Sequence, residues 1–276
     1  MRLFNKVVII GTGLIGGSLG LALKKRKLAS QIIGLSRHQK NVRLAKNSGA
    51  IDCIGSSLEV VKDADLVILA TPINAIIGIA LKIAKKIKKD CIVIDVGSTK
   101  ELVVSKVSRF IANFVGCHPL SGSEKKGVAN LQEGIFKNSI CVITPTAKTN
   151  KKILHKVSLL WRKLGSQVVI LSAKDHDRIL AFTSHLPHAV AFSLIGCIPE
   201  KFLSLSSGGL RDSTRISGSD ANLWSEVFLS NRRNLLVSLS SFQTKLAALK
   251  LALGNKNKII LTQILLSAKD KREKLG

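Results

Sequence analysis

The sequence contains no tyrosine, a single methionine and few acidic residues. Among its 276 residues, 17 Asp+Glu stand against 43 Lys+Arg, which gives a formal net charge of +26. Such an excess raises nucleic acid or an anionic membrane as partners. Aromatic residues make up only 4% of the chain and do not alternate with the cations, so no stacking platform for bases is indicated. We therefore expect no nucleic-acid binding, and we expect the positive surface to attract a small anionic substrate.

Cysteine is scarce and irregularly spaced. The five cysteines are an odd number and form no C-x-x-C motif; they are Cys53, Cys91, Cys117, Cys141 and Cys197. This pattern indicates neither a disulfide framework nor a structural zinc site. The sequence thus predicts no metal, and it predicts a reducing, cytoplasmic location.

One apolar run near the N-terminus, residues 7–23, could represent a signal peptide or a short membrane span. It contains five glycines, lacks a small-x-small cleavage site and ends in the basic run 24–27. No other run reaches the roughly 18 apolar residues that span a bilayer. We therefore expect no membrane association.

The first part of the chain alternates short β-branched runs with helical stretches, the pattern of a parallel sheet covered by helices. The expected strands are 6–10, 31–35, 66–70, 91–96, 113–117, 139–144 and 167–171. Between them, residues 75–89 place isoleucines at helical spacing and lysines on the opposite face, which predicts an amphipathic helix.

The β-rich runs stop after Ser172. Helical stretches follow at 175–198, 222–251 and 256–271, with a Gly/Ser-rich break at 204–209. The sequence predicts an α/β fold in which a Rossmann-type doubly wound sheet, residues 1–172, precedes an all-α domain, residues 173–276. Because helices alone cannot easily bury all their apolar faces, we expect the second domain to bind substrate and to form a homodimer.

A glycine motif, G-x-G-x-x-G, follows the first expected strand and opens a helix, which is the context that makes it informative. It comprises Gly11, Thr12, Gly13, Leu14, Ile15 and Gly16. The first glycine permits a tight turn, the second lets the backbone approach a pyrophosphate, and the third allows close packing of helix and strand. The motif predicts a bound dinucleotide.

The end of the second strand bears on which dinucleotide is used. An Asp or Glu about 20 residues after the glycines would bind the adenosine ribose of NAD. Here Ser36 and Arg37 follow the strand, and they offer a hydroxyl and a guanidinium to a 2′-phosphate. We therefore expect NADP, with NAD possible if Arg37 only covers the adenine.

Three further strand ends carry polar residues, and ligands bind at that edge of open α/β sheets. Thr71 and Pro72 follow one strand and Ser98 follows another, so these residues are expected to line the nicotinamide, although Ser98 could equally cap the next helix. His118 follows a third strand. A histidine there can take a proton from a substrate hydroxyl while the nicotinamide takes the hydride.

Ordered blocks of sequence resemble those of one enzyme family. They are the glycine-rich opening, D-V-G-S-T-K at 95–100, G-C-H-P-L-S-G-S-E at 116–124, T-S-H-L-P-H at 183–188 and G-L-R-D-S-T-R-I at 209–216. Together they resemble the prephenate/arogenate (cyclohexadienyl) dehydrogenases of tyrosine biosynthesis. The resemblance implies oxidative decarboxylation of prephenate to 4-hydroxyphenylpyruvate, or of arogenate directly to tyrosine, in a cleft between a Rossmann domain and a helical dimerisation domain. It also implies that no room remains for the regulatory domains of some members.

The resemblance assigns roles residue by residue. His118 corresponds to the catalytic histidine that engages the hydroxyl on ring carbon 4, and Ser98 assists there. Arg215 corresponds to the arginine that binds the side-chain carboxylate, a role suited to a two-pronged donor. Other cleft positions correspond to Ser184, His188, Glu124, Asp212 and Trp224.

Several alternatives stay open from the residues themselves. A β-hydroxyacid or pyrroline-carboxylate type reductase has a similar domain plan, whereas a short-chain dehydrogenase needs a tyrosine base that this chain lacks. The pair His185 and His188 could be metal ligands, but no matching set of Cys or carboxylate residues accompanies it. A non-catalytic dinucleotide sensor or a basic nucleic-acid binder is the alternative from outside the enzymes.

Overall fold

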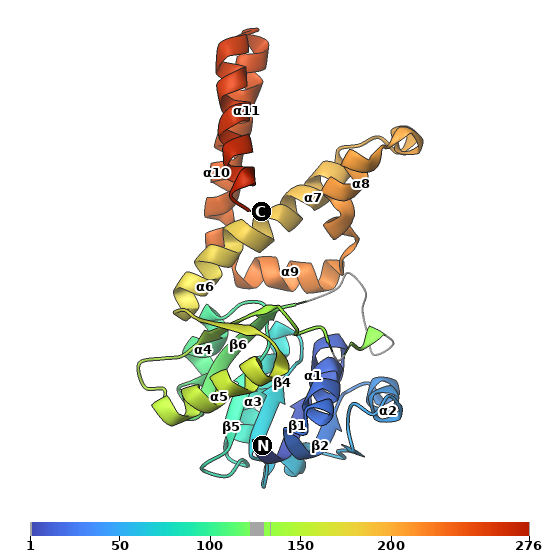
Figure 1. The fold of residues 1–276 in the computed structure, drawn as a ribbon, viewed down its shortest axis with the longest axis vertical. Coiled ribbons are helices and arrows are strands. Elements are labelled where there is room, and N and C mark those ends of the chain that lie inside the picture. Colours follow the sequence, from blue (N-terminus) through green and yellow to red (C-terminus); the bar gives the residue numbers. More distant parts are fainter. Residues whose placement is uncertain (1, 122–129, 133, 276) are drawn as a thin grey trace. The chain divides into compact units, whose positions relative to one another are not determined.

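We describe the fold from a computed structural model that covers residues 2–121, 130–132 and 134–275. The chain divides into two compact units, residues 1–231 and residues 232–276. The first unit holds an eight-stranded sheet and nine of the α-helices found in the described residues, and the second holds a pair of long helices (Figure 1). The predicted domain boundary at 172/173 stays a prediction.

The sheet has the strand order β3-β2-β1-β4-β5-β6-β7-β8. Its strands are β1 Phe4–Ile10, β2 Ala29–Leu35, β3 Cys53–Ile54, β4 Leu66–Leu69, β5 Ile92–Asp95, β6 Phe114–Leu120, β7 Ile140–Thr144 and β8 Gln167–Ile170. The first six positions follow the Rossmann order, in which the chain reverses direction across the sheet between β1 and β4. The predicted doubly wound sheet is confirmed.

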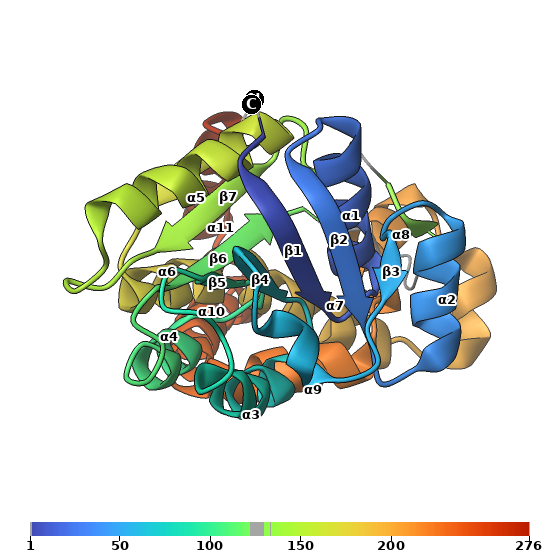
Figure 2. The same cartoon turned by 90° about the horizontal axis from the view of Figure 1, so that it is seen from below.

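Helices cover both faces of this sheet because side chains alternate between the faces along each strand. On one face Val7 and Ile9 pack with α1 Leu14–Lys25, α2 Gln39–Asn47 and α5 Lys151–Leu164. On the other, Val8 and Ile10 pack with α3 Ile73–Ala84 and α4 Glu101–Val107. Figure 2 shows α5 on the side of the sheet opposite α3 and α4.

The remaining helices of the first unit are α6 Ala173–Leu180, α7 Leu186–Gly196, α8 Gly208–Thr214 and α9 Ala221–Ser230. A π-helical segment, Ala181–His185, joins α6 to α7, and short 3₁₀ segments span Glu200–Leu205 and Arg215–Gly218. The second unit consists of α10 Arg232–Gly254 and α11 Lys258–Glu273, where Asn257 caps α11 by accepting from the backbone N–H of Ile260 at 3.0 Å.

Four details of the predicted elements were wrong. The sheet is not purely parallel, because β7 runs antiparallel to β6. The two-residue strand β3 was missed, since so short a run carries no periodicity. The expected helix 222–251 is interrupted at Asn231, and the expected break at 204–209 is partly helical. In each case the local residue pattern is compatible with both the expected and the observed structure, and tertiary contacts determine which of the two forms.

One continuous helix, Ala173–Gly196, combines α6, the π segment and α7, and among the described residues it is the only one long and apolar enough by length and composition to cross a membrane. In the sequence this stretch is not an uninterrupted apolar run, because polar residues are interspersed along it. Core helices of folded proteins can be equally long and apolar. The helix also carries His176 and Asp177, whose side chains are buried inside the protein.

Candidate active site

The glycine-rich turn adopts the geometry that a dinucleotide requires. Gly11 has φ +100°, and a Cβ placed on it would lie 2.3 Å from the carbonyl oxygen of Ala70. A Cβ on Gly16 would lie 1.9 Å from the carbonyl oxygen of Gly11. Gly13, by contrast, has open space around it and precedes the N-terminus of α1. The first and third glycines thus allow close packing, and the second leaves room for a ligand.

Neighbouring strand ends meet at this turn. The backbone N–H of Gly11 donates to the carbonyl of Leu35 at 2.8 Å, and that of Ala70 donates to Ile10 at 2.8 Å. The Oγ1 atoms of Thr12 and Thr71 are buried here and have no hydrogen-bond partner among the described residues. Buried hydroxyls normally have partners, so these atoms and the open space at Gly13 fit a bound dinucleotide.

A cavity of about 800 Å³ opens at the carboxyl ends of the strands. Its lining includes these predicted site residues: Gly13, Leu14, Ile15, Thr71, Pro72, Ser98, His118, Ser184, His188, Arg215 and Trp224. The structure therefore brings together residues of β-strand ends with residues from α6 to α9.

Some predicted site residues do not line this cavity. Three of them belong to the glycine-rich turn but are not among the lining residues: Gly11, Thr12 and Gly16. Two others lie at the end of β2, namely Ser36 and the exposed Arg37. The Oγ of Ser36 accepts a hydrogen bond from the backbone N–H of His38 at 3.2 Å. Asp212 is exposed on α8, and Glu124 lies outside the described residues. The roles assigned to these residues stay predictions.

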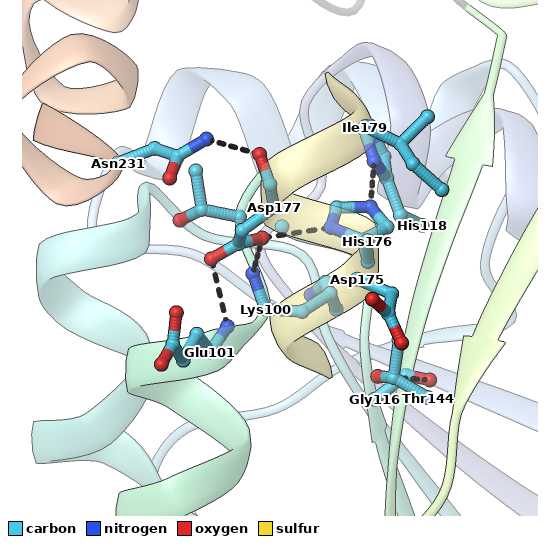
Figure 3. A network of polar contacts seen from close by, with 12 residues as sticks. Lys100, Glu101, Gly116, His118, Thr144, Asp175, His176, Asp177, Ile179 and Asn231 are labelled. Carbon is cyan, nitrogen blue, oxygen red and sulfur yellow. Dashed lines mark hydrogen bonds and ion pairs between the residues drawn. The ribbon is translucent and has the colours of Figure 1, made fainter. Parts of the chain in front are cut away.

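His118 heads a chain of hydrogen bonds that runs away from the cavity (Figure 3). Its Nδ1 lies 2.9 Å from Nε2 of His176, and Nδ1 of His176 lies 2.7 Å from Oδ1 of Asp177. His176 and Asp177 are buried at the start of α6. The two residues were not predicted as site residues.

This geometry fixes which ring nitrogens carry protons. The carboxylate of Asp177 accepts, so Nδ1 of His176 carries a hydrogen. Burial lowers the pKa of His176, more than the Asp177 carboxylate raises it, so the ring is neutral and its Nε2 accepts. His118 must then donate from Nδ1. The lone pair of His118 is left on Nε2, which is the arrangement of a general base.

His118 itself is held neutral. Burial lowers its pKa well below 6.5, and the neighbouring His176, Lys100 and His185 lower it further. A neutral imidazole can accept a proton across the neutral pH range.

Asp177 is fixed from several sides. Its carboxylate accepts from the backbone N–H of Lys100 at 2.7 Å and from that of Glu101 at 2.9 Å, at the N-terminus of α4. Asn231 donates from Nδ2 to the Asp177 carbonyl at 2.7 Å. A carboxylate at a helix N-terminus satisfies unpaired N–H groups and favours the negative charge. The base is thus supported by α4, α6 and the end of α9.

An ion pair lies beneath this network. The Lys100 ammonium contacts Oδ2 of Asp95, both side chains are fully buried, and the Gly97 N–H donates to the same oxygen at 2.9 Å. Burial raises the pKa of Asp95, and the Lys100 charge opposes that change. The pair fixes the loop 96–100, which carries Ser98 into the cavity.

An aromatic wall closes the other side of the cavity. His188 stacks on Trp224 with ring centroids 3.5 Å apart, and its Nδ1 donates to the carbonyl of Ser184 at 2.9 Å. Arg215 begins the 3₁₀ segment that follows α8 and lines the same cavity. A flat apolar surface beside a guanidinium can bind a ring that carries a carboxylate.

His185 and His188 were also considered as metal ligands, and in the described residues they belong to no group of three potential ligands. The Nδ1 of His185 lies 3.1 Å from Nδ2 of Asn231, and no group of three or more His, Cys, Asp or Glu side chains in the described part of the chain is arranged to hold an ion. One sequence signal could have pointed to the missed pair His176 and Asp177: the D-H-D run at 175–177, which places a histidine between two acids in the helix that follows β8.

The Rossmann sheet, the dinucleotide-compatible turn and the neutral histidine base in one cavity define a nicotinamide dinucleotide-dependent dehydrogenase. The family model for the nucleotide-binding domain of prephenate dehydrogenase matches residues 19–170, and that for its dimerization domain matches residues 172–266. The chain belongs to the prephenate dehydrogenase family, and it is an oxidoreductase.

Individual relatives are similar to this chain over most of its length. The cyclohexadienyl dehydrogenase of Zymomonas mobilis is 32% identical over 93% of this chain and 91% of its own. The prephenate dehydrogenase of Bacillus subtilis is 32% identical over 98% of this chain and 76% of its own. The crystal structure of prephenate dehydrogenase from Aquifex aeolicus with hydroxyphenyl propionate and NAD⁺ has a TM-score of 0.93 and 32% identity, and it covers 99% of this chain and 98% of that one.

Proposed function

We propose that this chain oxidises prephenate, with NADP as the preferred cofactor, to 4-hydroxyphenylpyruvate and carbon dioxide. The observation that carries the proposal is the His118–His176–Asp177 chain at one wall of a cavity whose other wall holds Arg215 and the His188–Trp224 stack. A base on one side and a cation with an aromatic surface on the other suit a ring with a hydroxyl at one end and a carboxylate side chain at the other.

His118 takes the proton of the hydroxyl on ring carbon 4 through Nε2. Gly13, Thr71 and Ser98 would hold the nicotinamide, which would supply the acceptor for the hydride of the same carbon. The ring carboxylate then leaves as carbon dioxide, its bonding electrons make the ring aromatic, and the proton held on His118 is available to the phenolate oxygen. Arg215 holds the side-chain carboxylate throughout, so its contact is present before and during the reaction.

The preference for NADP is supported by the end of β2. Ser36 and Arg37 follow this strand next to Gly11, and no carboxylate stands at positions 36–38 to repel a 2′-phosphate. The exposed Arg37 guanidinium is able to pair with that phosphate.

A homodimer in the cytoplasm is part of the proposal. The second unit exposes many large apolar side chains, namely Leu236, Val237, Leu246, Leu251, Leu253, Ile259, Ile260, Leu265 and Leu266. Surfaces of this kind are typical of association sites, and the match to a dimerization-domain model favours a second copy of the chain.

Arogenate is the second candidate substrate because of Asp220. This residue lines the cavity and caps α9 by accepting from the Asn222 N–H at 2.7 Å. Its carboxylate could pair with the amino group that arogenate carries in place of the keto oxygen of prephenate.

The test is steady-state turnover of the purified protein on prephenate and on arogenate, each with NADP and with NAD, followed by the absorbance of the reduced nicotinamide. Turnover of prephenate with NADP is expected to be fastest. Turnover of arogenate alone would favour the second candidate, and a strong preference for NAD would overturn the cofactor choice. No turnover in any combination would overturn the dehydrogenase proposal and favour a dinucleotide sensor.

A further inference from the structure

A single side-chain amide reaches two walls of the active site. Asn231 is 3% exposed and ends α9. Its Nδ2 lies 2.7 Å from the backbone oxygen of Asp177 and 3.1 Å from Nδ1 of His185. Asp177 belongs to the chain that supports the base, and His185 lies in the π-helical segment and lines the cavity.

These two distances determine which side-chain atoms of Asn231 and His185 carry hydrogens. A carbonyl oxygen only accepts, so the Asn231 atom next to Asp177 is the NH₂ group and not the amide oxygen. That group has two hydrogens, and the second one is directed at Nδ1 of His185. Nδ1 must therefore carry a lone pair, which leaves the proton of the neutral ring on Nε2.

The surroundings keep this ring neutral. Burial lowers the pKa of His185 to about 4, although the Asp177 carboxylate raises it; His176 and His188 lower it further. The groups that face the ring are Asp177 and His176 from α6, His188 from α7 and the Trp224 ring from α9. His185 is 1% exposed and lines the cavity, and within the described residues no hydrogen bond reaches its Nε2, so this N–H lacks an acceptor from the described chain.

We propose that Asn231 is a positioning residue that holds His185 as the Nε2–H tautomer, and that His185 thereby gives a neutral N–H donor to a carboxylate of the substrate. The carboxylate follows from the proposed function. A neutral donor adds a hydrogen bond to the anion without placing a full charge on the buried ring of His185.

The variant Asn231→Asp replaces the hydrogen-bond donor beside Nδ1 of His185 with an acceptor. A carboxylate accepts, so it would draw the proton to Nδ1 and turn the lone pair of Nε2 toward the substrate anion. KM for the substrate is expected to rise about tenfold or more, with a smaller change in kcat. Lowering the pH should reduce this difference, because a protonated ring donates from both nitrogens. The matched control is Asn150→Asp, the exposed cap of α5, where an Asp accepts the same N–H.

A KM that is the same in Asn231→Asp and wild type would overturn the proposal. So would a raised KM that does not fall again at lower pH, since a merely structural defect predicts no such recovery. Because Asn231→Asp also loses its donor to the Asp177 carbonyl, a measurement on the unaltered protein is needed as well.

That measurement is nitrogen-15 NMR of the histidine-labelled wild-type protein, with the His185 signals identified by comparison with His185→Gln. A neutral ring with its proton on Nε2 is expected at neutral pH, and this nitrogen should shift when hydroxyphenyl propionate is added as a carboxylate probe. An Nδ1–H tautomer, or no shift at saturating probe, would overturn the proposal. Failure of turnover on both dienyl substrates would overturn the proposed function instead, and it would leave the tautomer result in place.

Discussion

Nδ1 of His118 lies 2.9 Å from Nε2 of His176, although 58 positions separate the two residues in the sequence. The contact joins the end of β6 to the start of α6. It holds His118 in the tautomer that leaves a lone pair on Nε2, and Asp177 supports that tautomer through His176. The base function proposed for His118 thus depends on two residues that need not touch the substrate.

This dependence is tested by Asp177→Asn. An amide at this position can donate to His176, which would reverse the proton order along the chain and place a hydrogen on Nε2 of His118. We expect kcat to fall by about 10²-fold or more with little change in KM, because the defect lies in proton transfer. Steady-state kinetics on both substrates measures it.

The matched control is Asp175→Asn on the same helix, where the carboxylate is exposed and contacts Ser172 and Arg178. It loses the same charge two positions away and should keep nearly full kcat. Equal losses in the two variants would show that the charge or the helix, and not the proton order, is responsible.

The sequence predicted the parts of the site that depend on local pattern. The turn at 11–16 was predictable because a strand, a tight turn and a helix N-terminus each leave a signature in neighbouring residues. His118 was predictable because the carboxyl ends of parallel strands converge. The contact with His176 was not, since nothing local specifies that the start of α6 returns to the end of β6.

The same limit applies to the elements. The alternation of side chains along β7 is the same in either strand direction. The sequence therefore could not distinguish an antiparallel partner of β6 from a further parallel strand. The interruption at Asn231 was hidden because the apolar pattern continues across it. Only the tertiary structure shows that this residue leaves the helix to donate to Asp177 and His185.

Arg215→Lys tests carboxylate binding. Lysine keeps the charge but loses the planar pair of donors, so KM for prephenate should rise about tenfold while kcat changes much less. Arg211→Lys, at an exposed position on α8, is the control. A fall in kcat at unchanged KM would place Arg215 in the chemical step and not in binding.

Asp220→Asn tests substrate choice. Asparagine is as good a helix cap as aspartate, so α9 should be kept while the cavity loses a negative charge. KM for arogenate is expected to rise about tenfold, and KM for prephenate should stay constant or fall. Asp90→Asn, exposed after α3, controls for net charge. Equal effects on the two substrates would contradict a role for Asp220 in distinguishing them.

Arg37→Gln tests the cofactor. Removing the guanidinium should raise KM for NADP about tenfold and leave KM for NAD nearly constant, because only NADP carries the 2′-phosphate. The control Arg43→Gln removes an exposed charge on α2. If KM for NADP does not respond to Arg37→Gln, Arg37 does not bind the phosphate.

The buried histidines predict how stability depends on pH. Burial lowers the folded-state pKa of His176 and, to about 4, that of His185. Below an unfolded-state pKa of about 6.5 the unfolded chain takes up protons that the folded chain does not, so the free energy of unfolding falls as the pH falls. For His185 the slope approaches about 1.4 kcal/mol per pH unit and continues until the pH reaches about 4.

Denaturant unfolding between about pH 7 and about pH 5 measures this slope. His185→Gln should make it shallower by about 1.4 kcal/mol per pH unit, because a glutamine has no proton to gain in the unfolded state. Equal slopes in wild type and His185→Gln would mean that the folded protein protonates His185 as readily as the unfolded chain does. The neutral N–H donor at the cavity wall would then be lost in the same pH range.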